Sequence, residues 1–227
     1  MKNNQSEHLN IPSNETVIVL HGLFRTAFSM RKIARELKSD YRVVINNYPS
    51  RKNNIQALAE LAIKPALEGC KGSDKVHFVT HSLGGILVRQ FLLQNKIENL
   101  GHVVMLAPPN HGSEIVDRFQ SFGLSNWAFD KVNGPAGAQL GTLKGHLPKT
   151  LGPVDFSLGV IAGNVSFNPF LSSMLQGDDD GKVSVESSKI DGMRDHLVMP
   201  VSHTYMMSND AVIKQIKCFL KDGAFAR

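Results

Sequence analysis

Short apolar runs, each the length of one β-strand, constrain the fold of this chain more than any other feature. They include TVIVL at residues 16–20, KVHFV at 75–79 and HVVML at 102–106. Runs of this kind favour strands that are buried on both faces of a sheet. Between the first strands the apolar period changes to that of a helix, as at Met30, Ile33, Ala34 and Leu37. This alternation predicts an α/β fold: a mostly parallel central sheet with helices on both faces.

The same reading extends along most of the 227 residues and predicts a single domain over residues 1–227. Further strands are expected at 41–45, 156–163 and 196–201, and helices at 53–68, at 85–94 and at the C-terminus. Between about residues 110 and 153 the pattern loosens and glycine and proline become frequent. We expect this stretch to form a small cover or lid over the sheet. The apolar NPFLSSML, at 168–175, either contributes to an acyl-binding pocket or caps the core.

Composition narrows the class of protein. The chain is 42% hydrophobic and 20% charged, which is typical of a globular protein. Its net charge of +5 comes from scattered Lys and Arg residues, which predicts a solvated basic surface and no nucleic-acid site. Cys70 and Cys218 have neither zinc-ligand nor disulfide-framework spacing. A polar start and the lack of a long apolar stretch predict a cytoplasmic protein without membrane insertion, although a chain whose signal peptide had been removed would read the same way. Oligomeric state is left open.

The stretch VTHSLGG, at residues 79–85, is the strongest candidate for chemistry. An expected buried strand delivers Ser82 into a sharp turn, and an expected helix follows at once. This is the arrangement of a nucleophile elbow, which exposes a serine hydroxyl above the carboxyl edge of a sheet. The usual pattern is G-x-S-x-G, whereas Thr80 here takes the first glycine position. A purely structural serine is the alternative interpretation.

A serine nucleophile needs a base, and the base needs a carboxylate that orients it. In chains with such an elbow these follow in the order serine, acid, histidine. His203, between the last expected strand and the last helix, is favoured as the base over His196. For the acid we favour Asp180, at a tight turn after the strand at 156–163, with Asp179 second.

A tetrahedral intermediate also needs donors for its oxyanion. One is expected from the backbone N–H of Leu83, the residue after the nucleophile. The segment HGLFRT, at 21–26, ends the first expected strand and offers the second. Gly22 allows a bend there, and the Leu23 N–H is preferred to that of Phe24.

Taken together, these segments resemble the α/β-hydrolase superfamily, and within it a small group of lipase-like serine esterases. The resemblance covers about residues 16–225 and rests on VLHGLFRT, NYPSR, VTHSLGGILVRQ, MLAPPNHGSE, GPAGAQLGT, DDGKVSVES and SHTYMM. It implies the α/β-hydrolase fold, a triad of Ser82, Asp180 and His203, and oxyanion donors at Leu23 and Leu83. It also implies that the PNHGS turn lines the site, with structural packing as the alternative for His111 and Ser113. Phe24, His111 and Trp127 are expected as substrate-lining residues.

The function expected from these residues is hydrolysis of a small-molecule carboxylic ester through an acyl-enzyme, with no metal or organic cofactor. Thioesterase, peptidase or acyltransferase chemistry would use the same residues. A catalytically silent binding protein on the same fold is the rival from another class. A haloalkane dehalogenase is disfavoured, because it would need an aspartate at position 82.

Overall fold

Six strands form one sheet in the computed structural model of this chain, which describes residues 14–121, 133–142 and 146–227. In chain order they are β1 (Thr16–Leu20), β2 (Arg42–Ile45), β3 (Val76–His81), β4 (Leu100–Leu106), β5 (Leu158–Gly163) and β6 (Asp195–Met199). Each lies at an expected strand, with ends that shift by up to two residues. Every pairing in the sheet is parallel. The predicted parallel sheet is thus confirmed.

The order of the strands across the sheet is β2-β1-β3-β4-β5-β6. From β1 the chain first moves outward to β2 and then returns to β3 on the other side of β1. The loops that leave the carboxyl ends of β1 and β3 therefore diverge. In open parallel sheets such a switch point is where ligands bind.

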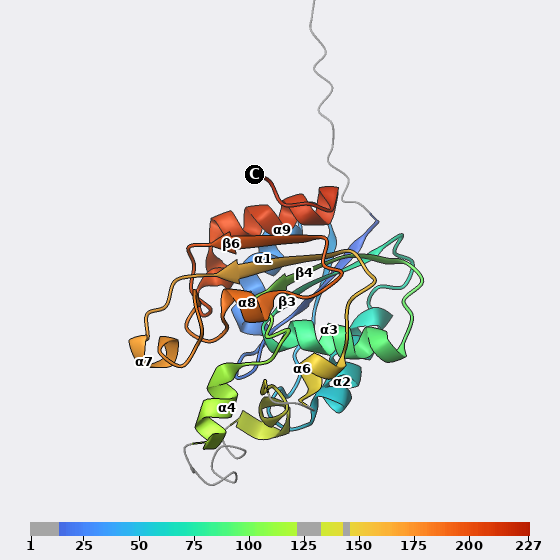
Figure 1. The fold of residues 1–227 in the computed structure, drawn as a ribbon. Helices are drawn as coiled ribbons and strands as arrows, with labels where there is room; N and C mark the ends of the chain where they lie inside the picture. Colours follow the sequence, from blue (N-terminus) through green and yellow to red (C-terminus); the bar gives the residue numbers. More distant parts are fainter. Residues whose placement is uncertain (1–13, 122–132, 143–145) are drawn as a thin grey trace, which may run out of the picture.

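Four long helices cover the two faces of the sheet (Figure 1). One face carries α1 (Arg31–Leu37) and α9 (Asp210–Asp222), and the other carries α2 (Ile55–Glu68) and α3 (Leu83–Gln94). Strand β1 serves both faces, because Val17 and Val19 pack in the first core and Ile18 and Leu20 in the second. The continuous apolar runs in the sequence arise from this double burial.

Other helical segments lie in the connections. They are η1 (Ala27–Met30), α4 (Glu114–Ser121), a helical stretch at 133–138, α6 (Leu147–Thr150), α7 (Pro169–Ser172), α8 (Val185–Ser188) and η2 (Met206–Ser208). In the expected cover, Ala136, Leu140 and Leu151 are buried in the core beneath α2 and α3. These residues of 110–153 thus complete the core, and the division into one domain with a cover stays a prediction. Trp127 lies outside the described residues.

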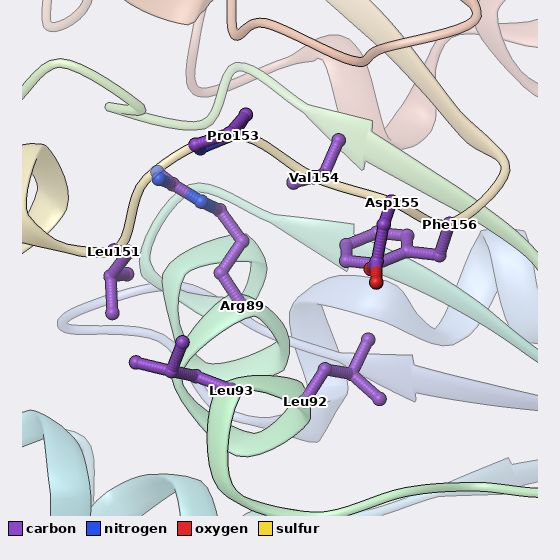
Figure 2. Close-up of a pocket in the computed structure, with 8 residues that line it drawn as sticks. All are labelled: Arg89, Leu92, Leu93, Leu151, Pro153, Val154, Asp155 and Phe156. Carbon is purple, nitrogen blue, oxygen red and sulfur yellow. The ribbon is translucent and has the colours of Figure 1, made fainter.

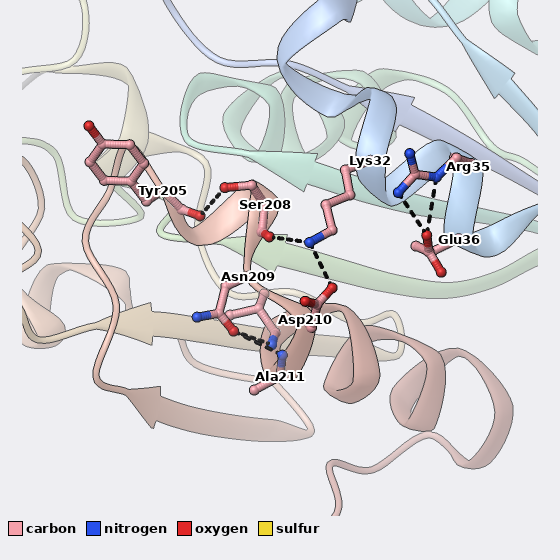
Figure 3. A network of polar contacts seen from close by, with 9 residues as sticks. Lys32, Arg35, Glu36, Tyr205, Ser208, Asn209, Asp210 and Ala211 are labelled. Atoms are coloured by element: carbon pink, nitrogen blue, oxygen red, sulfur yellow. Dashed lines mark hydrogen bonds and ion pairs between the residues drawn. The ribbon is translucent and has the colours of Figure 1, made fainter.

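The loop between β6 and α9, which carries His203, is fixed at its far end by polar contacts (Figure 3). From α1, Lys32 Nζ donates to the carbonyl of Ser208 at 2.7 Å and pairs with Asp210 at 2.7 Å. The side chain of Asn209 caps α9 by accepting from the N–H groups of Ala211 and Val212. The end of the loop that leads into α9 is therefore held by contacts with α1 and by the cap of α9.

In the described part of the chain, none of the helices combines the length and apolar character that spanning a membrane requires.

Candidate active site

Ser82 is the single residue between β3 and α3. Its φ of 52° and ψ of −121° lie where a residue with a side chain is sterically disfavoured. Its N–H donates to the carbonyl of Leu106 on β4 at 2.8 Å, and its own carbonyl accepts from Gly85 N–H at 3.0 Å. These bonds hold the strained turn that a nucleophile elbow requires. Helix α3 begins at Leu83, two residues earlier than expected, so strand and helix meet at the serine itself.

Small residues after the serine let α3 approach the sheet. A Cβ on Gly84 would lie 3.0 Å from the carbonyl oxygens of Leu20 and His21, and one on Gly85 would lie 2.9 Å from the sulfur of Met105. Thr80, which replaces the usual glycine before the serine, is fully buried in β3. The sheet thus accommodates threonine at position 80. Close packing of α3 against the sheet instead requires glycine at positions 84 and 85.

His203 and Asp180 meet as a buried pair. The imidazole Nδ1 lies 2.8 Å from Asp180 Oδ2, and the His203 N–H donates to the Asp180 carbonyl at 3.0 Å. The other carboxylate oxygen, Oδ1, accepts from the N–H groups of Lys182 at 3.0 Å and Val183 at 2.9 Å. With Nδ1 committed to the carboxylate, the ring has Nε2 left to accept a proton from a hydroxyl.

A glycine at the end of β5 makes this meeting sterically possible. A Cβ on Gly163 would lie 2.9 Å from the Cβ of Asp180 and 2.2 Å from the carbonyl oxygen of Val201. The loops that carry the acid and the histidine therefore cross closely at this residue.

The second-ranked residues for acid and base have other partners. Asp179 accepts from Oγ of Ser172, the last residue of α7, and from Gly181 N–H at 2.7 Å. His196 Nε2 lies 2.9 Å from Ser188 Oγ. Neither contacts the His203 ring or Ser82 through any hydrogen bond between described residues.

The loop after β1 is pressed against the elbow. A Cβ on Gly22 would lie 2.9 Å from His81 Nδ1 and 3.0 Å from the Cβ of Ser82, so only glycine fits there. Before it, the rings of His21 and Tyr48 stack with centroids 4.0 Å apart, and Tyr48 Oη donates to the carbonyl of His21. Leu23, the expected oxyanion donor, thus follows two residues that pack closely against Tyr48 and against the elbow. Leu83, the other expected donor, opens α3, where backbone N–H groups have no partner within the helix.

His81 links the nucleophile turn to the loop of the expected base. Its Nε2 lies 3.0 Å from the His203 carbonyl oxygen, and the two rings lie 4.6 Å apart. Because a carbonyl only accepts, Nε2 carries the proton. Burial, and then the nearby His203, hold the pKa of His81 well below its ordinary 6.5. A neutral imidazole is therefore expected here.

Ser82 and His203 line one cavity of about 310 Å³ at the switch point between β1 and β3. Its apolar wall includes Leu23, Phe24, Val116, Leu140 and Leu171. Of the expected substrate-lining residues, Phe24 lines this cavity, while His111 lines a neighbouring one with Glu114 and Ser184. Leu171 belongs to the NPFLSSML stretch, which thus reaches the site.

Two cations in this cavity were not found by sequence reasoning. Arg25 lies within the expected oxyanion segment at 21–26, Lys182 is two residues after the expected acid, and both line the cavity that contains Ser82. Their positions next to predicted site residues, in LFR and DDGK, were the available signal. Partial desolvation and the neighbouring Arg25 lower the pKa of Lys182.

A larger cavity of about 400 Å³ lies elsewhere, beside α3 (Figure 2). It is lined by Arg89, Leu92, Leu93, Leu151, Pro153, Val154, Asp155 and Phe156. None of these is a serine, cysteine or histidine, so the residues suited to nucleophilic chemistry gather in the smaller cavity. Within the described ranges, no group of three or more His, Cys, Asp or Glu side chains is arranged to hold a metal ion.

Comparison with known proteins gives matches at the level of structure. No protein-family model matches the chain, and no curated protein matches its sequence significantly. Among solved structures, the propeptide form of the Bacillus licheniformis lipase BlEst2 superposes with a TM-score of 0.72 at 19% identity, over 96% of this chain and 54% of that one. Its mature form gives 0.62 at 20% identity, over 93% and 90%.

The metagenomic carboxyl esterase MGS0156 is similar as well, with a TM-score of 0.69 at 17% identity, over 86% of this chain and 66% of that one. This chain thus spans about half the length of the propeptide form and two thirds of the metagenomic enzyme. At such identities the likeness concerns architecture. With its parallel sheet, helices on both faces and strand–serine–helix turn, the chain has the α/β-hydrolase fold.

Proposed function

We propose that this chain hydrolyses carboxylic esters through an acyl-enzyme formed on Ser82. The observation that carries the proposal is that a serine held in a strained elbow lines the same cavity as His203, whose ring is paired with the buried Asp180. The structural neighbours named as lipase and carboxyl esterase support the same reaction class.

In the proposed reaction, Ser82 Oγ attacks the ester carbonyl while His203 Nε2 takes its proton. The carbonyl oxygen becomes an oxyanion that accepts from the N–H groups of Leu23 and Leu83. Collapse of this intermediate breaks the bond to the alcohol, which leaves with the proton from His203. Water then attacks the acyl-serine with the same proton transfers, so that acid is released and Ser82 is regenerated.

Asp180 has a positioning and electrostatic role in this proposal. Its bond to Nδ1 fixes the tautomer that leaves Nε2 free, and its charge stabilises the imidazolium that forms. The two N–H groups that donate to Oδ1 keep the carboxylate oriented.

The test uses 4-nitrophenyl butyrate and a fluorophosphonate probe on the whole chain. We expect the wild-type protein to release 4-nitrophenol and to be labelled at Ser82, and Ser82→Ala to do neither. Equal turnover by the two proteins would overturn the proposal. Absence of both turnover and labelling in the wild-type chain would instead favour the catalytically silent binding protein.

A further inference from the structure

The rim of the Ser82 cavity is positively charged. Arg25 and Lys182 both line it, from the loops after β1 and β5. Arg51 adds a third cation at this edge, with its guanidinium 4.9 Å from the centre of the Phe24 ring. Such a concentration of one sign beside an apolar cavity raises the local concentration of anions.

The opposite charge that acts on Lys182 is that of Asp180, which forms no direct ion pair with it. Among the residues that the structure describes, neither Arg25 nor Lys182 forms an ion pair. The nearby carboxylate of Asp180 is already engaged by His203 and two backbone N–H groups. The two cations also affect each other, since Arg25 lowers the pKa of Lys182. An anion placed between them would relieve this repulsion.

The location of the two cations relates them to the reacting atoms. Arg25 is two residues after Leu23, and Lys182 is two residues after Asp180. Both side chains line the cavity that contains Ser82, and the apolar wall formed by Val116, Leu140 and Leu171 completes it. A ligand that fits both features has an apolar part and an anionic group close to its ester.

We propose that the substrates of this site are carboxylic esters that carry a carboxylate or phosphate near the ester bond, bound between Arg25 and Lys182. This inference rests on the proposed esterase function and specifies its substrate class. Guanidinium and ammonium groups both bind such anions through charge-assisted hydrogen bonds.

The test compares 4-butanoyloxybenzoate with its neutral methyl ester. For each protein we take the ratio of kcat/KM for the anionic ester to kcat/KM for the neutral ester. Dividing the ratio of a variant by that of the wild type cancels the intrinsic reactivity of the two leaving groups. We expect this ratio to fall about 10-fold in Arg25→Gln or Lys182→Gln, and more in the double variant, from the loss of charge-assisted hydrogen bonds.

The matched control is the double variant Lys71→Gln, Lys96→Gln, which removes two exposed positive charges elsewhere on the surface. It should leave the ratio unchanged. An equal loss on both esters in the Arg25 and Lys182 variants would overturn the proposal, because it would mean that the cations act on the oxyanion common to both. A wild-type preference for the neutral ester that survives in the variants would overturn it as well.

Two further arms separate the possible failures. Calorimetry compares the affinity of the protein for 4-hydroxybenzoate with its affinity for the neutral methyl ester, and needs no turnover. Tighter binding of the anion without any ester hydrolysis would mean that only the esterase function fails, whereas equal binding of the two would mean that the anionic subsite is absent. Dihexanoyl phosphatidylglycerol and phosphatidylcholine, each supplied as monomers and as micelles, then distinguish sources of the anion. Hydrolysis of the phosphatidylglycerol that rises on micelle formation would identify a lipid headgroup, whereas hydrolysis of the soluble esters alone would identify a free anionic ester.

Discussion

The two cavities described above differ in how their cationic side chains are used. In the larger one, Arg89 is buried and donates to the carbonyl oxygens of Asn110, Pro148 and Gly152 and to the Asn110 side chain, at 2.9 to 3.1 Å. In the smaller one, Arg25 and Lys182 form no ion pair with the described residues. The comparison indicates that the size of a cavity is a weaker sign of function than the presence of charged side chains that form no ion pair with the described residues.

The largest expected effect is on the chemistry of the smaller cavity. Ser82→Ala should lower kcat/KM for 4-nitrophenyl butyrate by at least about 10⁴-fold, since only binding and the oxyanion donors would remain. Its melting temperature should stay close to that of the wild type, because the hydrogen bonds that hold the elbow are made by the backbone of Ser82. A large loss of stability would show that Ser82 is a structural residue.

Asp180→Asn tests the His–Asp pair. We expect a fall in kcat of about 10³- to 10⁴-fold, because an amide can donate to Nδ1 and so stabilise the wrong tautomer. Asp179→Asn is the matched control, since Asp179 bonds to Ser172 and Gly181. A greater loss in the control than in Asp180→Asn would assign the role of the acid to the neighbouring carboxylate.

Substitution at the larger cavity should affect stability instead of chemistry. Arg89→Met leaves three backbone carbonyls without their donor, and we expect a loss of about 3 kcal/mol in the free energy of unfolding, measured in urea. Arg25→Met removes a cation that forms no ion pair with the described residues, and it should change the same quantity by less than about 0.5 kcal/mol. Similar losses in the two variants would break the comparison between the cavities.

The smallest expected effect concerns pH. Burial lowers the pKa of His81 well below its ordinary 6.5, so below pH 6.5 the unfolded chain binds a proton that the folded chain does not. Stability should therefore fall as the pH drops from 6.5 towards the folded pKa, by up to about 1.4 kcal/mol per pH unit for this group. His21 and His77, whose pKa values burial also lowers, act in the same direction. His81→Gln should reduce the slope of urea-unfolding free energy against pH; an unchanged slope would show that His81 takes up its proton in the folded state.

The sheet and the elbow could be predicted because local sequence specifies them. The apolar runs fix the strands, and the Ser82 turn lies between two elements with clear periodicity. The His203 and Asp180 predictions used chain order and the position of each residue after an expected strand. Their 2.8 Å contact depends on the close crossing at Gly163, which no local pattern reveals.

The cationic rim could not be read from composition. Arg25 and Lys182 lie on loops far apart in sequence, and each looks like one of the many scattered basic residues that predict a solvated surface. Both loops leave the carboxyl edge of the parallel sheet, and the folded chain brings them to one cavity. Arg89 poses the converse problem, since an arginine within GILVRQFLLQ gives no sign that it is buried until the carbonyls around it are known.

The bond between the His81 ring and the His203 carbonyl has a mechanical consequence. His81, which precedes the proposed nucleophile, is hydrogen-bonded to the backbone of His203, the proposed base. A displacement of one of the two loops is therefore expected to move the other. Insertions in the surrounding loops could then alter which molecules enter the cavity while the spacing between hydroxyl and imidazole is preserved.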